Sequence, residues 1–261
     1  MKIRALTLNV LYRGDSRARL RALGKILREA DYDVVCLQEV ISPLNLALLR
    51  QVTSPSYPHS AHGGVFPAVA GGVVTVSRWP ITARRYVRYP LTMPVQRGWL
   101  MRRGVLVTQL MIGGQRLTVM NTHLTANMDN DWSSGANRYV RAEKVELGRL
   151  AGVVRRATST VPLLVVGDFN VPRDSSYFLD FAQAAGLRDV LAGDAEPTFR
   201  PIPTWPRPPA IDQVLVRPSE SHEVTGEARL CMKDQVTLPD GRRAYLSDHF
   251  GIEADLQLVA R

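Results

Sequence analysis

Six short polar clusters stand at the ends of apolar runs in this chain, and their side chains are of the types that catalyse hydrolysis. They are Asn9, Gln38-Glu39, Asn121-Thr122-His123, Asp168-Phe169-Asn170, Asp212 and Asp248-His249. A carboxylate or imidazole beside a buried strand is costly unless it is paired, hydrogen-bonded or bound to a metal. One such residue is explained by a cap or a turn, but six clusters at expected strand ends indicate a shared site.

The clusters supply four carboxylates, two imidazoles and several amides. The carboxylates are those of Glu39, Asp168, Asp212 and Asp248. Oxygen ligands without a cysteine cluster favour a hard cation, so Mg²⁺ is the expected cofactor and Mn²⁺ the alternative. Because Mg²⁺ usually takes only one or two protein carboxylates, the other acids are left to orient an imidazole or a nucleophile.

Rival reaction classes lack their motifs in this sequence. It contains no P-loop, no His-Glu-x-x-His zinc motif and no Gly-x-Ser-x-Gly nucleophile elbow. Its two cysteines, Cys36 and Cys231, are too few for a disulfide framework or a zinc cluster. The polar clusters therefore remain the best candidates for chemistry.

The composition is that of an ordinary globular protein, with 45% hydrophobic and 22% charged residues among 261. We find no repeat and no long Ser/Gly linker, so we expect one domain over residues 1–261. No segment approaches the roughly 20 continuous apolar residues of a membrane helix. The N-terminus resembles a strand rather than a signal peptide, which predicts a cytoplasmic protein.

Strand-like runs rich in Val, Ile, Leu and Thr recur along the chain. We predict strands over 3–10, 33–40, 72–77, 104–112, 115–124, 162–166, 211–216 and 250–258. Gly113-Gly114 between two of them is a hairpin signal. We predict helices over 17–30, after the capping candidates Asp15 and Ser16, over 137–156, and over 175–185, before a C-terminal Gly186.

The hairpin region over 72–124 interrupts the alternation of strands and helices, which favours mixed sheets flanked by helices. Two segments look irregular, the polar stretch over 125–136 and the proline-rich stretch over 199–210. Both adjoin a polar cluster, where substrate loops are often found. Among the tryptophans, Trp205 in the proline-rich stretch is the best candidate for substrate contact. Residues 127–132 are expected to border the pocket.

Taken in order, the clusters resemble the endonuclease/exonuclease/phosphatase superfamily. The match includes Asn121-Thr122-His123-Leu124, Gly167-Asp168-Phe169-Asn170 and Ser247-Asp248-His249, and it spans almost the whole chain. The resemblance implies a four-layer α/β sandwich in which two packed mixed β-sheets are flanked by helices, with the site at one sheet edge.

The resemblance also implies a role for each residue. Glu39 would be the principal metal ligand, Asn9 would help to hold the metal or the phosphate, and Asp248 would contact the metal or support its neighbour. Asp168 and Asn170 would position the nucleophile and contact the phosphoryl oxygens.

His249 is the candidate general base, since an imidazole titrates near neutrality, and Asp212 is its expected carboxylate partner. Asp168 remains an alternative base. His123 would donate to a non-bridging oxygen, where charge develops. The implied mechanism is direct attack of water on phosphorus.

Within the superfamily the spacers are most similar to those of neutral sphingomyelinases, as in 54–59 and 71–81. The chain departs from them over 98–104 and lacks a hydrophobic membrane-inserting hairpin. We therefore expect a phosphodiesterase acting on a phospholipid headgroup or a related small phosphodiester. The alternatives are a nuclease, a phosphomonoesterase acting on an inositol, sugar or metabolite phosphate, and a catalytically inactive binding module.

The net charge of +9 would attract nucleic acid, an anionic membrane surface in peripheral contact, or a phosphorylated metabolite. A basic stretch formed by arginines between 84 and 103 either faces such a substrate or forms a solvated strand face. Its members are Arg84, Arg85, Arg88, Arg97, Arg102 and Arg103. Charge alone does not choose the partner, and the sequence does not predict the oligomeric state.

Overall fold

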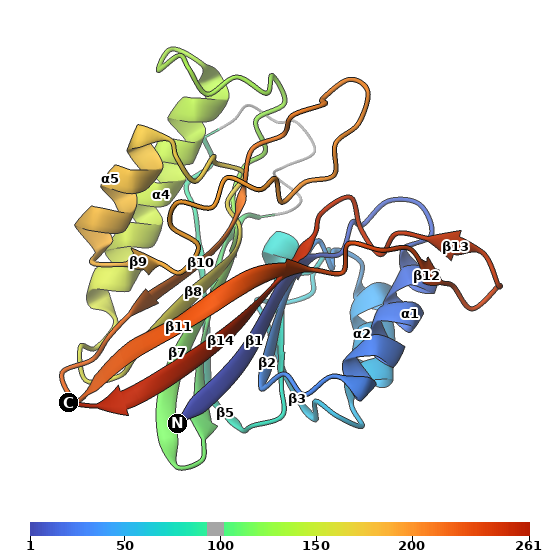
Figure 1. Ribbon diagram of the computed structural model, residues 1–261, viewed down its shortest axis with the longest axis horizontal. Coiled ribbons are helices and arrows are strands. Elements are labelled where there is room, and N and C mark those ends of the chain that lie inside the picture. Colours follow the sequence, from blue (N-terminus) through green and yellow to red (C-terminus); the bar gives the residue numbers. More distant parts are fainter. Residues whose placement is uncertain (93–101) are drawn as a thin grey trace.

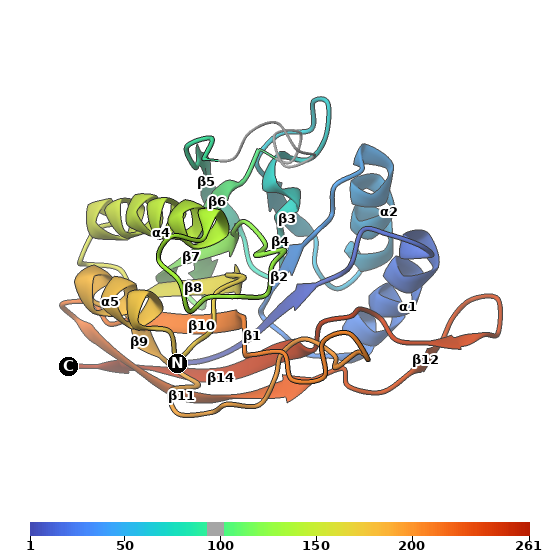
Figure 2. The ribbon, with the colours of Figure 1, turned by 90° about the horizontal axis from the view of Figure 1, so that it is seen from above.

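The computed structural model describes residues 1–92 and 102–261. Two six-stranded mixed sheets pack face to face, and a pair of helices covers the outer face of each (Figures 1 and 2). This is the four-layer α/β sandwich that the sequence predicts. Arg97, a member of the predicted basic stretch, lies outside the described residues, as do residues 98–101 of the segment that departs from the sphingomyelinases.

The first sheet has the strand order β11-β14-β1-β2-β4-β3. Its strands are β1 (Lys2–Asn9), β2 (Val34–Gln38), β3 (His59–His62), β4 (Val74–Ser77), β11 (His222–Cys231) and β14 (Gly251–Ala260). Only β1 and β2 run parallel; every other neighbouring pair is antiparallel. The helices α1 (Ser16–Glu29) and α2 (Pro43–Thr53) cover its outer face.

The second sheet has the order β5-β6-β7-β8-β10-β9. Its strands are β5 (Ile81–Arg88), β6 (Gly104–Ile112), β7 (Gln115–His123), β8 (Leu163–Asp168), β9 (Arg188–Asp189) and β10 (Asp212–Arg217). Here β7 and β8 are the parallel pair. The helices α4 (Arg138–Arg156) and α5 (Ser176–Ala185) cover this sheet. A short 3₁₀ turn, η1 (Ala70–Gly72), and a two-stranded ribbon of β12 (Val236–Thr237) and β13 (Arg243–Ala244) lie outside both sheets.

Both faces of the central strands are buried, which is why they appear as nearly continuous apolar runs. In β1, Ile3 and Ala5 point into the core between the sheets, whereas Leu6 and Leu8 point toward α1 and α2. This alternation follows from the two-residue period of a strand. No helix in the described part of the chain is long and apolar enough to cross a membrane.

The predicted strands and helices are confirmed within a few residues. Gly113 and Gly114, both with positive φ, form the predicted hairpin turn, and Gly186 ends α5 in the left-handed conformation. The capping prediction for α1 is confirmed in position only, since Asp15 is its N-cap residue. Asp15 makes no capping bond because its carboxylate pairs with Arg242, and the Ser16 hydroxyl accepts a hydrogen bond from Asn45.

Eight elements of the described structure were not predicted: α2, η1, β3, β5, β9, β11, β12 and β13. The edge strand β5 exposes Arg84, Arg85 and Arg88, so it has no apolar alternation to detect. Charged side chains are a common protection of edge strands against further pairing. These three arginines are solvent-exposed, as a solvated strand face requires, and their exposure also leaves them accessible to a polyanionic substrate.

Candidate active site

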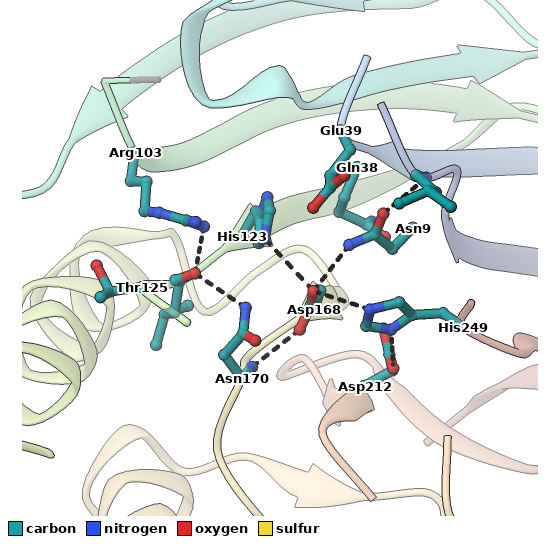
Figure 3. A network of polar contacts seen from close by, with 12 residues as sticks. Asn9, Gln38, Glu39, Arg103, His123, Thr125, Asp168, Asn170, Asp212 and His249 are labelled. Atoms are coloured by element: carbon teal, nitrogen blue, oxygen red, sulfur yellow. Dashed lines mark hydrogen bonds and ion pairs between the residues drawn. The ribbon is translucent and has the colours of Figure 1, made fainter. Parts of the chain in front are cut away.

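Strand register brings the predicted clusters to one edge of the sandwich. Asn9 ends β1 beside Gln38, and His123 ends β7 beside Asp168 at the end of β8. Asp212 opens β10 directly opposite Asp168 in an antiparallel pair. Because parallel strands end at the same edge, residues far apart in the sequence converge there (Figure 3).

Asp168 lies at the centre of this cluster, with only 1% of its surface exposed. Its Oδ2 atom accepts a hydrogen bond from Nδ2 of Asn9 at 2.9 Å and lies 3.4 Å from Nε2 of His123. Nε2 of His249 is 3.7 Å from the same oxygen (Figure 3). Burial raises the pKa of Asp168, and the nearby His249 opposes that shift. This one oxygen atom therefore lies close to three of the predicted site residues.

His249 is held between two carboxylates. Its Nδ1 atom lies 2.9 Å from Oδ2 of Asp212, and its ring edge packs against Phe199 with centroids 5.1 Å apart. Burial alone would lower the pKa of His249, but Asp212 and Asp168 raise it above the ordinary histidine value. The Asp212 contact fixes the ring so that Nε2 faces the centre of the site.

His123 and Asn170 form the opposite side. Burial, the Arg103 guanidinium and His249 together hold the pKa of His123 well below its ordinary value, so its imidazole is neutral. Its Nδ1 atom has no hydrogen-bond partner within the described residues. Asn170 donates its backbone N–H to Oδ1 of Asp168 and its side-chain amide to the carbonyl of Leu124, at 2.9 and 3.1 Å.

Glu39 lies across from this group and is half-buried. It has a positive φ of 64°, and its Oε2 accepts the backbone N–H of Tyr12 at 2.9 Å. Asp248 accepts a hydrogen bond from the Ser247 hydroxyl at 3.2 Å. The negative charges of Glu39 and Asp248 both act on the guanidinium groups of Arg13 and Arg19, so the two carboxylates lie near the same pair of arginines.

The donor chemistry of the site fits a hard divalent cation, because carboxylate and amide oxygens dominate and neither cysteine lies among these residues. Gln38, beside Glu39, also keeps a buried carbonyl oxygen without a partner in the described structure. Asp168, Asp212 and His249 form a second candidate set, with ligand atoms within 4.8 Å of one another. Their existing mutual contacts suit proton transfer equally well.

Several residues that support the site were not predicted. The Thr198 hydroxyl accepts the backbone N–H groups of Ile211 and Asp212, and its carbonyl accepts that of Phe250. Thr198 therefore links the backbone of Asp212 to that of Phe250, the residue after His249. It precedes an irregular proline-rich loop, where no periodic pattern distinguishes it.

Aromatic rings line the site between His249 and Asn170. Phe199 contacts Trp205 with ring centroids 5.1 Å apart, and Trp205 stacks on Trp132 at 6.1 Å. The indole N–H of Trp132 donates to the carbonyl of Asn170 at 3.2 Å. The two predicted loops thus meet at this edge through Trp205 and Trp132.

A family model described as "Endonuclease/Exonuclease/phosphatase family" matches residues 6–249. The chain belongs to this family. Among curated proteins it is 30% identical over 190 residues to a putative neutral sphingomyelinase of Drosophila melanogaster, covering 68% of this chain and 41% of that protein. It is 27% identical over 200 residues to human sphingomyelin phosphodiesterase 2, covering 73% of this chain and 46% of that protein.

An inositol phosphosphingolipids phospholipase C of Schizosaccharomyces pombe is 30% identical over 161 residues, or 59% of this chain and 36% of that protein. The chain thus spans less than half the length of these curated relatives.

Solved structures share the fold over nearly the whole chain. A beta toxin of Staphylococcus aureus has a TM-score of 0.78 at 18% identity, covering 97% of this chain and 99% of its own. D. rerio TDP2 complexed with a single-strand DNA product has a TM-score of 0.76 at 21% identity, covering 98% and 99%. At such identities these structures establish the family's sandwich architecture for this chain.

Proposed function

We propose that this chain is a divalent-metal-dependent phosphodiesterase that hydrolyses a phospholipid headgroup or a related small phosphodiester by direct attack of water on phosphorus. The observation that carries the proposal is the convergence of the buried His249–Asp212 pair and Asp168 at one sheet edge. Family membership and the sphingolipid-directed names of the relatives support it.

In this proposal Glu39 holds the cation, with help from Asn9 and Asp248, and Mg²⁺ is the ion that suits these oxygen donors, with Mn²⁺ as the alternative. The solved structure of a beta toxin mutant "with bound magnesium ions" supports the choice of ion. When bound, the cation neutralises charge on the phosphoryl group.

The protein groups then divide the remaining work. Either His249, oriented by Asp212, or Asp168 accepts the proton of the attacking water. If His249 is the base, Asp168, which lies beside Nε2 of His249, holds that water in place. The neutral imidazole of His123 and the amide of Asn170 donate to the phosphoryl oxygens as charge develops on them. This arrangement needs no covalent intermediate.

A substrate panel tests the proposal. Bis-p-nitrophenyl phosphate, sphingomyelin in mixed micelles, plasmid DNA and inositol phosphates are each incubated with Mg²⁺, with Mn²⁺ and with EDTA. We expect hydrolysis of the synthetic diester and of the lipid, lost in EDTA and restored by the ion. Absence of turnover on every diester would overturn the proposal.

A nuclease is the second candidate, favoured by the net charge of +9 and by the DNA complex of D. rerio TDP2. Its affinity for DNA would fall steeply as salt rises, because binding releases counterions from phosphates. A headgroup hydrolase in micelles would show little salt dependence. Hydrolysis of the inositol phosphates alone would identify a phosphomonoesterase. One domain over residues 1–261 and a cytoplasmic location stay predictions.

A further inference from the structure

Two glutamates of α4 are buried beneath the loop over 125–136, and the proposed mechanism uses neither. Glu143 is 0% exposed and Glu146 is 2% exposed. They are three residues apart, so they lie on one face of the helix. A buried carboxyl is costly unless its hydrogen bonds are made, which raises the question of what these two hold.

Glu146 holds the residue that follows the end of β7. One carboxylate oxygen accepts the backbone N–H of Thr125 at 2.8 Å, and the other accepts its hydroxyl at 2.7 Å. The preceding carbonyl, that of Leu124, accepts hydrogen bonds from the Asn170 side-chain amide and from the Arg103 guanidinium. Glu146 thus fixes Thr125. Through Thr125 it also fixes the preceding Leu124 carbonyl, which accepts the Asn170 amide and directly follows His123.

Glu143 holds the other part of the same loop. Its Oε2 accepts the Tyr177 hydroxyl of α5 at 2.7 Å, whereas its buried Oε1 has no hydrogen-bond partner among the described residues and faces the electrostatic influence of the Trp132 indole. Trp132 in turn donates to the Asn170 carbonyl and stacks on Trp205. Burial raises the pKa of Glu143 to about 8, so the carboxyl is mainly protonated at neutral pH.

We propose that Glu146 and Glu143 are positioning residues of the active site, Glu146 for the Asn170 amide and Glu143 for the aromatic wall of Trp132 and Trp205. This inference rests on the proposed function. The Asn170 amide stabilises charge that develops in the transition state, so its misplacement lowers kcat. The aromatic wall contacts the parts of the substrate that do not react, so its displacement raises KM.

Kinetics on bis-p-nitrophenyl phosphate and on the preferred lipid substrate separate the two roles. We expect Glu146→Ala to lower kcat roughly 10- to 100-fold with little change in KM, the scale of a misplaced donor. We expect Glu143→Ala to raise KM for the lipid about 10-fold with kcat nearly unchanged. Arg149→Ala, an exposed residue of the same helix, is the matched control.

Conservative variants distinguish positioning from general packing. In Glu146→Gln the amide still bonds to both Thr125 groups, and in Glu143→Gln the side chain mimics the neutral acid, so both should keep kcat and KM within about 3-fold of wild type. Thr125→Val removes only the hydroxyl bond and should give a smaller loss of kcat than Glu146→Ala. If either alanine variant, folded by circular dichroism at the assay temperature, kept wild-type kcat and KM, the proposal would be wrong for that residue.

Proteolysis provides a readout that needs no turnover. Chymotrypsin cleaves after exposed aromatic residues, and Trp132 lies within the loop. We expect Glu143→Ala and Glu146→Ala to be cut there several-fold faster than wild type, and the glutamine variants at the wild-type rate. If wild type hydrolyses no diester but these rates differ as expected, the proposed function fails while the anchoring stands. Equal rates in all variants would refute the anchoring itself.

Discussion

Nδ1 of His249 lies 2.9 Å from Oδ2 of Asp212, although the strands that position the two residues belong to different sheets. Asp212 opens β10 in the second sheet, and His249 stands two residues before β14 in the first. The pair therefore exists only when the two sheets are packed against each other. The core between the sheets, which includes Val214 and Ile252, is what holds the pair in register.

Replacing Asp212 with asparagine tests this pair directly. The amide keeps the shape of the carboxylate but removes its charge, so it no longer supports protonation of the His249 ring. We expect kcat to fall by about 10²–10³ with KM nearly unchanged, because general acid–base catalysis contributes on that scale. Asp31→Asn, in the exposed segment that precedes β2 at the end of that strand away from Glu39, is the control. A kcat within twofold of wild type would argue for Asp168 as the base.

The metal assignment predicts that Glu39→Ala removes the response to Mg²⁺. Wild type should bind the ion by isothermal titration calorimetry and melt at a higher temperature in its presence, since a ligand that binds the folded state stabilises it. The variant should show neither effect and should lose hydrolysis. Glu223→Ala, on β11 at the end away from the site, should behave as wild type. Unchanged ion binding by the Glu39 variant would move the ligand set to Asp168, Asp212 and His249.

The buried Glu143 predicts a pH dependence of stability. Its pKa is raised in the folded state to about 8 from 4.5, so the folded protein holds this proton more tightly than the unfolded chain does. Its contribution to stability is complete below pH 4.5 and is lost as the pH rises through 8. Glu143→Gln cannot lose a proton. Urea unfolding from pH 5 to 8 should therefore show wild type losing on the order of 1–4 kcal/mol relative to the variant. Parallel curves would contradict the raised pKa.

Gly167, next to Asp168, predicts a stability effect of backbone geometry. Its φ is +142°, and a Cβ atom there would lie 2.0 Å from the carbonyl oxygen of Thr122 in β7. Gly167→Ala should destabilise the protein by roughly 2–4 kcal/mol, through strain and overpacking. Gly148→Ala in α4, where a Cβ meets nothing within 4 Å, should instead stabilise it by roughly 0.5–1 kcal/mol. Thermal unfolding of both variants measures the contrast.

Most of the site was predictable because the chemistry-bearing residues end or open strands. Asp168 and His123 follow runs of apolar residues, and the parallel pairing of β7 with β8 then places them side by side. The supporting residues gave no such signal. Glu143 and Glu146 stand in a helix where charged residues are usual, and only the tertiary structure shows that they point inward. The sequence analysis predicted the chemical groups of the candidate site and the contact between His249 and Asp212, but not the other contacts that hold these groups.

The pairing of β1 with β14 has a consequence for how this protein is made. The strand that carries Asn9 lies in the middle of its sheet, between β2 and a strand that the ribosome makes more than 240 residues later. Until that strand leaves the exit tunnel, the sheet has a gap and His249 has no fixed place. A nascent chain should therefore be catalytically silent throughout most of its translation, and hydrolytic activity would report the moment at which the last strand is inserted.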